Sequence, residues 1–377
     1  MTVLHRAMER EGYSGTRWDD ALLPGPLERV ARARADLRLG LPVVLSDAGQ
    51  GWLVMAVEGL TEARFAAAQG FGAAVLILSA ARLDALGWKE PGKGAALPVA
   101  GLTLWQIRGY ADPVAVAGIP DEPPERVDVA QSVVETAILL AKGAQLLPAV
   151  VAVRLADMSL ARDGRVTMLT CAEVEAAAMR LSDHHTVSAA SVPLAVSALG
   201  QVEVFRPDDG GAEHYAVRIG APDPDAPVLV RLHSACFTGD VLGSVKCDCG
   251  PQLHAAMAAM AAEGSGVLLY LNQEGRGIGL ANKMRAYALQ GRGLDTVEAN
   301  HQLGFADDER DFRVGAELLQ RLGIWTVRLM TNNPAKMAML RAQGITVVER
   351  VPLRVGARAE NARYLAAKAA KSGHLLP

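Results

Sequence analysis

Three of the four cysteines lie close together in the chain, at positions 236, 247 and 249. Three thiolates can close three corners of a tetrahedral zinc site and leave the fourth for water, which is the pattern of a catalytic site. Bound zinc lowers the pKa of water toward about 7 and so makes hydroxide available at neutral pH. Spacing alone leaves two alternatives open: buried free thiols, or a structural zinc with a fourth ligand such as His233 or His254. Cys171 lies apart in an apolar setting typical of a small core residue.

A glycine-rich turn follows further along, in the segment Gln273-Glu-Gly-Arg-Gly-Ile-Gly. Its three glycines let backbone amides approach an anion at a helix start, and Arg276 offers a planar fork for phosphate oxygens. Glu274 could accept hydrogen bonds from N1 and N2 of guanine. The motif lacks the Lys-Ser/Thr ending of a P-loop and does not match the dinucleotide fingerprint. A turn without a ligand is an equally good interpretation of this motif alone.

Three further groups are candidates for chemistry. Tyr287 lies on the helix after the turn, a polar run covers 307–311, and Thr331-Asn-Asn-Pro-Ala-Lys336 follows a strand. Taken singly, a packing tyrosine and a solvated loop are the simpler interpretations of the first two. The third is a better site candidate, because ligands in α/β sheets bind where strands end.

Strands and helices alternate around these motifs. A strand at 228–233 leads to the cysteines, and a helix at about 251–262 is closed by Gly264. A strand from Gly266 to Leu271 runs into the glycine-rich turn, and a helix follows to Gln290. Helices at 313–322 and 334–342 and strands at 326–330 and 345–349 complete the pattern. This alternation predicts an α/β domain with helices packed on a largely buried sheet.

The chain before position 200 also has short apolar strands between helical patterns. The clearest elements are a helix over Pro26–Leu37, a strand over Gly40–Leu45, a helix over Val127–Leu147 and a strand over Ala149–Leu155. With a length of 377 residues, this pattern predicts two domains, at 1–200 and 201–377. The expected fold class is therefore α/β (α+β) with two domains.

The amino-acid composition is that of an ordinary globular protein. With 50% hydrophobic and 21% charged residues, the chain is globular and not mostly disordered. A net charge of −3 gives no long-range attraction for nucleic acid or an anionic membrane, so any anion site must be local. No apolar run reaches the roughly eighteen residues that cross a bilayer, and the first residues lack the apolar core of a signal peptide. We therefore expect a cytoplasmic protein.

In this order, the motifs resemble those of GTP cyclohydrolase II, the enzyme that begins riboflavin synthesis, from Val228 to His374. The matching blocks are Arg231-Leu-His-Ser, Thr238-Gly-Asp, Cys247-Asp-Cys-Gly, Gln273-Glu-Gly-Arg, Lys283-Met-Arg-Ala-Tyr-Ala-Leu-Gln, Asp295-Thr-Val-Glu-Ala-Asn-His-Gln-Leu-Gly-Phe, Glu309-Arg-Asp-Phe and Thr331-Asn-Asn-Pro. So many blocks in register outweigh the separate alternatives given above for each motif.

The resemblance implies a zinc-dependent hydrolase that opens the imidazole ring of GTP at C8. It would release formate and pyrophosphate and yield 2,5-diamino-6-(5-phosphoribosylamino)pyrimidin-4(3H)-one. One zinc per chain would be held by Cys236, Cys247 and Cys249, and Mg2+ would bind with the triphosphate. A homodimer is also expected. The GTP contacts would be Arg231, Leu232, His233, Ser234, Ala235, Gln252, Glu274, Gly275, Arg276, Thr296, Thr331 and Lys336.

The resemblance also implies catalytic roles for three residues. Tyr287 would hydrogen-bond the attacking water or relay its proton. In the pyrophosphate step the family assigns Asp308 as proton acceptor and Arg310 as nucleophile. Because a guanidinium does not readily lose its proton, stabilisation of transition-state charge by Arg310 is the alternative. The sequence departs from the family's usual pattern at two positions. Ala235 stands where the family often has Glu. Lys246 stands where the family often has Arg, and it keeps the positive charge but not the planar, two-pronged hydrogen-bonding group of arginine.

The region from about Leu27 to Phe205 resembles a degenerate form of another enzyme of riboflavin synthesis, 3,4-dihydroxy-2-butanone 4-phosphate synthase. The similar blocks are Gly40-Leu-Pro-Val-Val-Leu-Ser-Asp, Ala56-Val-Glu-Gly-Leu-Thr-Glu and Leu146-Leu-Pro-Ala. Ala48-Gly-Gln-Gly-Trp replaces that family's acidic loop, and Val133 and Arg154 align with its catalytic histidine and glutamate. Without acids to hold magnesium or a base to enolise the sugar, we expect this domain to be inactive.

Two other classes of function compete with this interpretation. A related zinc hydrolase could act on another nucleotide, such as a pyrimidine nucleotide, but the intact Glu274-Gly-Arg and the Asp308/Arg310 pair argue against it. A non-catalytic nucleotide-binding regulator would be favoured by loss of a zinc cysteine, yet all three are present.

Overall fold

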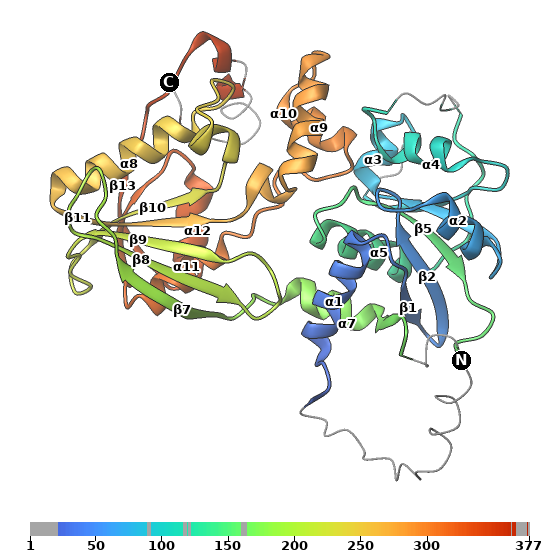
Figure 1. The fold of residues 1–377 in the computed structure, drawn as a ribbon. Helices are drawn as coiled ribbons and strands as arrows, with labels where there is room; N and C mark the ends of the chain where they lie inside the picture. Colours follow the sequence, from blue (N-terminus) through green and yellow to red (C-terminus); the bar gives the residue numbers. More distant parts are fainter. Residues whose placement is uncertain are drawn as a thin grey trace, which may run out of the picture.

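The chain forms two β-sheets, each with its own helices, which lie side by side as two lobes (Figure 1). The computed structural model describes residues 22–88, 92–115, 119, 122–159, 164–362, 364–366 and 375. The predicted two-domain α/β class is confirmed. Among the described residues, none of the helices is both long and apolar enough to cross a membrane.

The first sheet has the strand order β4-β3-β5-β2-β1-β6 and is antiparallel except between β1 and β6. Its strands are β1 (Val43–Asp47), β2 (Gln50–Ala56), β3 (Ala74–Leu78), β4 (Ala95–Pro98), β5 (Ala149–Arg154) and β6 (Thr167–Thr170). Its helices are α1 (Pro26–Arg38), α2 (Glu62–Gln69), α3 (Ala80–Ala85), α4 (Leu104–Ala111), α5 (Gln131–Gly143) and α7 (Cys171–Met179). Helices α1, α5 and α7 share a core with one face of the sheet, and α2, α3 and α4 share a core with the other. Cys171 is buried in the first of these cores, as predicted.

Helix α1 illustrates how local sequence sets these elements. Pro26 occupies the first helical turn, where its missing N–H costs nothing, and Glu28 accepts a hydrogen bond from the Gly25 N–H at 2.6 Å. Val30, Ala33 and Leu37 are buried, and their spacing places them on one face of the helix. The sequence predicted this helix to within one residue.

The second sheet has the order β13-β12-β10-β11-β9-β8-β7. Strands β10 to β13 are parallel to one another, and the sheet continues antiparallel through β9, β8 and β7. Its strands are β7 (His184–Ser191), β8 (Gly200–Pro207), β9 (His214–Gly220), β10 (Val228–Ser234), β11 (Ser265–Leu271), β12 (Thr326–Met330) and β13 (Thr346–Val351). The helices of this part are α8 (Cys249–Glu263), α9 (Leu280–Gly291), α10 (Thr296–Gln302), α11 (Arg313–Arg321) and α12 (Pro334–Ala342). Helices α11 and α12 share a core with one face of the sheet, and α8 with the other.

Two sequence predictions about boundaries differ from the structure. The division after Gly200, the first residue of β8, separates β7 from β8, but both strands pair in the second sheet, so the chain changes sheets between α7 and β7. The helix predicted over Val127–Leu147 is shorter at both ends. Val127 pairs with Ala96 in an isolated bridge, and Gln145 has a φ of +57°, which a helix cannot continue through.

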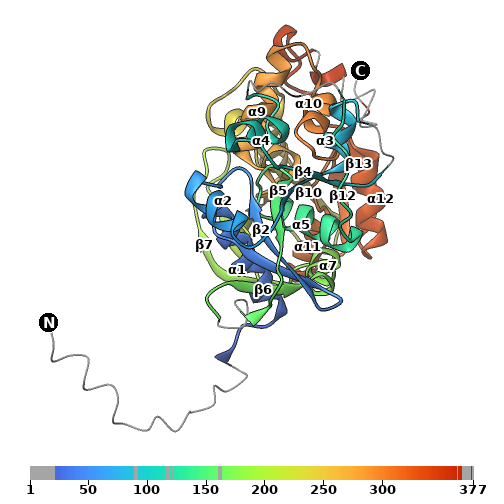
Figure 2. The ribbon, with the colours of Figure 1, turned by 90° about the vertical axis from the view of Figure 1, so that its right-hand side faces the viewer.

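Helices α9 and α10 pack between the two lobes, beside α3 and α4 (Figure 1, Figure 2). One face of this helix pair is buried in the core of the first domain, through Ala286, Leu289, Ala299, Leu303 and Phe305. The two domains therefore share a continuous apolar core on this side.

Candidate active site

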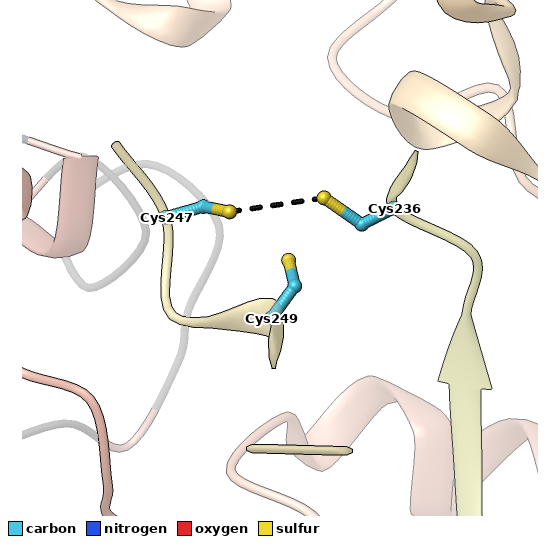
Figure 3. A group of neighbouring side chains, drawn as sticks. All are labelled: Cys236, Cys247 and Cys249. Atoms are coloured by element: carbon cyan, nitrogen blue, oxygen red, sulfur yellow. Dashed lines mark hydrogen bonds between the residues drawn. The ribbon is translucent and has the colours of Figure 1, made fainter. Parts of the chain in front are cut away.

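The three clustered cysteines come from two segments that fold toward each other. Cys236 follows the end of β10, Cys247 lies just before α8, and Cys249 is the first residue of α8 (Figure 3). The Sγ atoms of Cys236 and Cys247 are 3.7 Å apart, and all three sulfurs lie within 4.8 Å of one another. Zinc with Zn–S bonds of about 2.3 Å at tetrahedral angles separates two sulfurs by about 3.8 Å. The cluster therefore fits a zinc ion.

A fourth protein ligand is not found in the described part of the chain, where no histidine or carboxylate joins the three cysteines. His254 is exposed on α8, and His233 Nε2 lies 3.1 Å from both oxygens of Asp240. Neither of the two histidines considered from the sequence completes a structural site. The arrangement matches the three-ligand pattern with one open position.

The turn after Cys236 covers the cluster closely. A Cβ atom on Gly239 would lie 2.8 Å from Cys247 Sγ and 3.1 Å from Cys236 Sγ. A Cβ atom on Gly250 would in turn lie 2.3 Å from the carbonyl oxygen of Gly239. Glycine is required at both positions because neighbouring atoms leave no room for a Cβ atom, and not because the backbone has an unusual φ.

Lys283 places a positive charge beside the cysteine cluster. Its Nζ donates to Cys236 Sγ at 3.0 Å and to Glu274 Oε1 at 2.8 Å. Burial alone would lower the pKa of Lys283, but these two partners outweigh it and raise that pKa. Hydrogen bonds from Cys247 and Cys249, and then from Lys283, hold the pKa of Cys236 far below its usual value. A low pKa favours the thiolate form of Cys236, which is the form that binds metal.

Asp240 fixes the loop that carries Cys236. Its carboxylate accepts hydrogen bonds from the Cys236 backbone N–H at 2.9 Å and from the Tyr270 hydroxyl at 3.0 Å, and it pairs with His233. Burial lowers the pKa of His233 more than Asp240 raises it, so the imidazole is neutral. With Nε2–H donating to Asp240, Nδ1 is left as a buried acceptor that finds no partner among the described residues.

Two adjoining cavities, of roughly 650 and 600 Å³ including space open to solvent, lie beside the cysteine cluster, and Cys249 lines both of them. The first is lined by Arg231, His233, Ser234, Asp248, Cys249, Gln252, Arg276, Arg310, Thr331, Asn332, Asn333, Lys336 and Tyr364. The second is lined by Ser234, Ala235, Cys236, Cys247, Cys249, Gln273, Glu274, Gly275, Arg276, Ile278, Lys283, Ala286, Tyr287, Gln290, Thr296, Asn300, Arg310 and Tyr364. Five residues line both, so the cavities form one continuous site.

The first cavity is rich in cations. Arg231 is buried, donates to Gln252 Oε1, and keeps its charge, because burial lowers its pKa only to about 10. Lys336 Nζ donates to the Leu232 carbonyl oxygen at 3.1 Å and lies over the Phe312 ring. Arg276 has a φ of +62° in the glycine-rich turn, and its Nη1 donates to the Asp307 carbonyl oxygen at 3.2 Å. Several positive groups around one cavity suit a polyanionic ligand such as a triphosphate.

Arg310 lies on the arginine loop, defined here as Asp307–Asp311. Its Nε donates to Asp308 Oδ1 at 2.8 Å and its Nη2 to Asp308 Oδ2 at 2.5 Å. Burial raises the pKa of Asp308, but the hydrogen bonds from Arg310 outweigh it and hold that pKa below the usual value. Nη1 of Arg310 reaches Ser234 Oγ at 3.3 Å, so the guanidinium extends from its carboxylate partner into the cavity.

Tyr287 and Glu274 lie in the second cavity. The Tyr287 hydroxyl is 3.5 Å from Thr238 Oγ1, and burial raises its pKa, so the phenol stays protonated at neutral pH. Glu274 accepts hydrogen bonds from the backbone N–H of Phe237 at 2.6 Å and of Gly275 at 2.9 Å, in addition to Lys283. A carboxylate offers about four acceptor positions, so one remains for a ligand.

The residues predicted from sequence converge on this site with two exceptions. Leu232 is buried in the core, and its carbonyl oxygen accepts from Lys336. Asp308 lies behind Arg310 and does not line either cavity. The predicted residues that line a cavity are Arg231, His233, Ser234, Ala235, Cys236, Cys247, Cys249, Gln252, Glu274, Gly275, Arg276, Tyr287, Thr296, Arg310, Thr331 and Lys336.

Sequence reasoning missed several lining residues. Lys283 stands one helical turn before Tyr287, so the i, i+4 spacing on α9 could have placed both on the same face. Asn300 lies on α10, whose start is marked by a capping box in which Asp295 accepts from the Glu298 N–H at 3.0 Å and Glu298 accepts from the Asp295 N–H at 2.9 Å. Nothing in the sequence pattern singled out Asp248 or Tyr364.

Comparison with known proteins agrees with this site. The family model for GTP cyclohydrolase II matches residues 185–352. A protein of Azotobacter vinelandii named GTP cyclohydrolase-2 is 58% identical over 172 residues, which are 46% of this chain and 83% of that protein. A protein of Bacillus mycoides named riboflavin biosynthesis protein RibBA is 53% identical over 189 residues, 47% of this chain and 48% of that protein. The match therefore spans about half the length of this second relative.

A solved structure also matches, that of RibBX from A. baumannii, described as a two-domain 3,4-dihydroxy-2-butanone 4-phosphate synthase. It covers 87% of this chain and 99% of its own at 16% identity, with a TM-score of 0.32. A likeness at this level does not identify the first domain.

The matched segment begins at β7 and includes the cysteine cluster, the glycine-rich turn and the arginine loop. With most of one relative matched at 58% identity, the chain belongs, through its second domain, to the GTP cyclohydrolase II family of hydrolases.

Proposed function

We propose that this chain is a zinc-dependent GTP cyclohydrolase of riboflavin biosynthesis, which opens the guanine ring at C8 and releases formate and pyrophosphate. The observation that carries the proposal is the position of the cysteine cluster, where the cation-rich cavity meets the cavity of Glu274 and Tyr287. One site can then hold the triphosphate and the purine while a metal lies near the ring.

Cys236, Cys247 and Cys249 would hold the zinc. When bound, zinc supplies an activated water near neutral pH and polarises the group that is attacked. Lys283, whose Nζ donates to Cys236 Sγ at 3.0 Å, would neutralise part of the negative charge of the cluster. Tyr287, as a protonated phenol beside Thr238, would hydrogen-bond the attacking water or relay its proton.

The cation-rich cavity would bind the triphosphate together with Mg2+. Arg231, Arg276, Arg310 and Lys336 supply the positive charge. Because Asp308 holds Arg310 as a paired guanidinium, we assign Arg310 to stabilising charge in the transition state and not to nucleophilic attack. Asp308 would orient it.

The purine would occupy the second cavity. Glu274 keeps one acceptor position for the guanine N–H groups, and Thr296 and the backbone at Ser234, Ala235 and Gly275 line the same space. Gln252 and Thr331 are proposed contacts in the first cavity. The unpaired Nδ1 of His233 would accept a hydrogen bond from the substrate or an ordered water. A cytoplasmic location and a homodimer, both expected from the sequence, complete the proposal.

A substrate panel tests the proposed function against its alternatives. Purified, zinc-loaded protein is incubated with Mg2+ and with GTP, ATP, UTP or CTP, and formate and pyrophosphate are assayed together. We expect both products from GTP and neither from the pyrimidine nucleotides. Ring opening of a pyrimidine nucleotide would indicate a related hydrolase of different specificity. Tight binding of GTP without either product would indicate a regulator.

Replacing Gly239 with alanine should weaken zinc binding about tenfold or more, since forcing a methyl group against packed atoms costs about 1–3 kcal/mol. The added Cβ would lie within 3.1 Å of two of the metal-binding sulfurs. Gly291→Ala is the matched control, because a Cβ there meets nothing within 4 Å. Zinc per chain is measured by elemental analysis after dialysis against a weak chelator. Equal zinc retention in the two variants would contradict the proposed metal site.

For the first domain we propose that the synthase chemistry has been lost. Val133 is fully buried in the core of α5, and Arg154 donates to Gln50 Oε1 at 2.8 Å on the sheet surface. Neither side chain can act as a base in place of the histidine and glutamate expected there. The full chain, given ribulose 5-phosphate and Mg2+, should therefore produce no 3,4-dihydroxy-2-butanone 4-phosphate by mass spectrometry. A measurable, enzyme-dependent yield would show that the domain is active.

A further inference from the structure

The arginine loop is held from two directions. On one side the Glu309 N–H donates to the Arg276 carbonyl oxygen at 3.0 Å, which joins the loop to the glycine-rich turn. On the other side Glu309 Oε1 pairs with Lys142 Nζ at 2.6 Å and also accepts the Ala306 N–H at 2.8 Å. Lys142 belongs to the first domain, on α5. An ion pair between the domains therefore ends one residue away from Arg310.

Lys142 is itself fixed in place. It lies in the last turn of α5, and its Nζ is 5.9 Å from the centre of the Phe305 ring. Phe305 is fully buried in the core that the two domains share. Only about a quarter of each side chain of the Lys142–Glu309 pair is exposed, 24% and 23%. The pair is therefore less screened by solvent than an ordinary surface ion pair.

The same end of α5 also contacts the helix that carries Lys283 and Tyr287. The Gln145 carbonyl oxygen accepts a hydrogen bond from Asn282 Nδ2 at 2.9 Å, and Asn282 is fully buried. The left-handed φ of Gln145 turns the chain away from α5 at this point. One helix end of the first domain thus contacts the arginine loop and α9, which present Arg310 and Lys283 to the site.

We propose that Lys142 is a positioning residue for the phosphate site, so that the first domain contributes to the reaction of the second; this inference rests on the proposed function. Lys142 fixes Glu309, Glu309 holds the start of the arginine loop through Arg276 and Ala306, and Arg310, the next residue, meets the phosphates. Groups that stabilise a transition state lose much of their effect when displaced by about 1 Å, which commonly costs between tenfold and a hundredfold in rate.

Lys142→Met tests this proposal in the full-length protein, because methionine keeps the length and the apolar contact with Phe305 but removes the charge. The control is Arg34→Met, which breaks another ion pair between the domains, Arg34–Asp209 at 3.3 Å, whose side chains are 23% and 24% exposed. Neither Arg34 nor Asp209 lines the site. Lys142→Arg and Glu309→Gln are made alongside, with the double variant Lys142→Met/Glu309→Gln. The measurements are kcat and KM for pyrophosphate release, zinc per chain and the thermal midpoint.

We expect Lys142→Met to lower kcat by about tenfold with little change in KM for GTP or in zinc content. Lys142→Arg should restore most of the rate, and the double variant should be no slower than Lys142→Met alone. Arg34→Met should stay close to wild type in rate. Equal rates for Lys142→Met and Arg34→Met, or additive losses in the double variant, would overturn the inference while leaving the proposed function intact. A wild-type chain that released neither product would overturn the proposed function, and this inference with it.

Discussion

Replacing Arg310 with alanine is expected to slow pyrophosphate release from GTP by roughly a hundredfold to a thousandfold. The reason is that Arg310 is the cation whose partner, Asp308, lies on its own loop, so that its guanidinium is oriented toward the cavity before substrate binds. A preorganised charge of this kind acts on the transition state and costs no reorganisation during the reaction. If pyrophosphate release precedes ring opening, formate release should fall by the same factor.

Arg313→Ala is the matched control for this variant. Arg313 forms the same two-residue pairing, with Asp311 at 2.7 Å, but it lines neither cavity. The two variants therefore remove equal charge from neighbouring positions, and only one of them removes charge from the site. Wild-type rates for both products in Arg310→Ala would make Arg310 an ordinary surface residue. The phosphate role would then pass to Arg276 and Lys336.

Replacing Cys249 with serine is expected to abolish formate production. The substitution removes one of three sulfur ligands, and a neutral hydroxyl is a poor ligand for zinc compared with a thiolate. Zinc per chain should fall with it. Some pyrophosphate release should remain, because Cys249 lines the cation-rich cavity but the cations there belong to other residues, Arg231, Arg276, Arg310 and Lys336.

Cys171→Ala controls for the loss of a buried thiol. Cys171 lies in the core of the first domain, where burial raises its pKa and keeps it a neutral thiol. That variant should keep its zinc and its formate production. Formate production by Cys249→Ser at the wild-type rate would show that ring opening does not depend on the cluster.

The sequence predicted the second domain well wherever its elements carry a strong periodicity. Strands β10 and β11 and helices α9, α11 and α12 lie within a few residues of their predicted positions, because their buried faces require that spacing. The cysteine spacing predicted the convergence of the three thiols for a similar reason, since residues so close in sequence can lie close enough to hold one metal ion.

The predicted division at position 200 separates β7 from the other strands of its sheet, and the sequence of β7 explains why. All of its residues after His184 are exposed, so it shows no alternation of buried and exposed positions that would connect it to either sheet. Its pairing with β8 and the hydrogen bonds between His184 and Glu317 on α11 place it in the second sheet.

The contacts between the domains could not be predicted for the same physical reason. Lys142 and Glu309 are 167 positions apart, and a lysine in the last turn of a helix is usually a solvated end that favours the helix dipole. Likewise, Glu274 was predicted as a guanine acceptor, but three of its acceptor positions hold Lys283 and two backbone N–H groups. Such competition between partners depends on the folded geometry.

The most direct measurement of the central claim is the yield of formate per GTP consumed as a function of zinc occupancy. The purified protein is stripped of metal, zinc is added back stepwise in the presence of Mg2+, and formate, pyrophosphate and remaining GTP are quantified together. The account predicts that formate rises in proportion to bound zinc, saturates at one zinc per chain, and then equals the GTP consumed. Formate production at full rate without zinc, or none at full occupancy while GTP is bound, would contradict it.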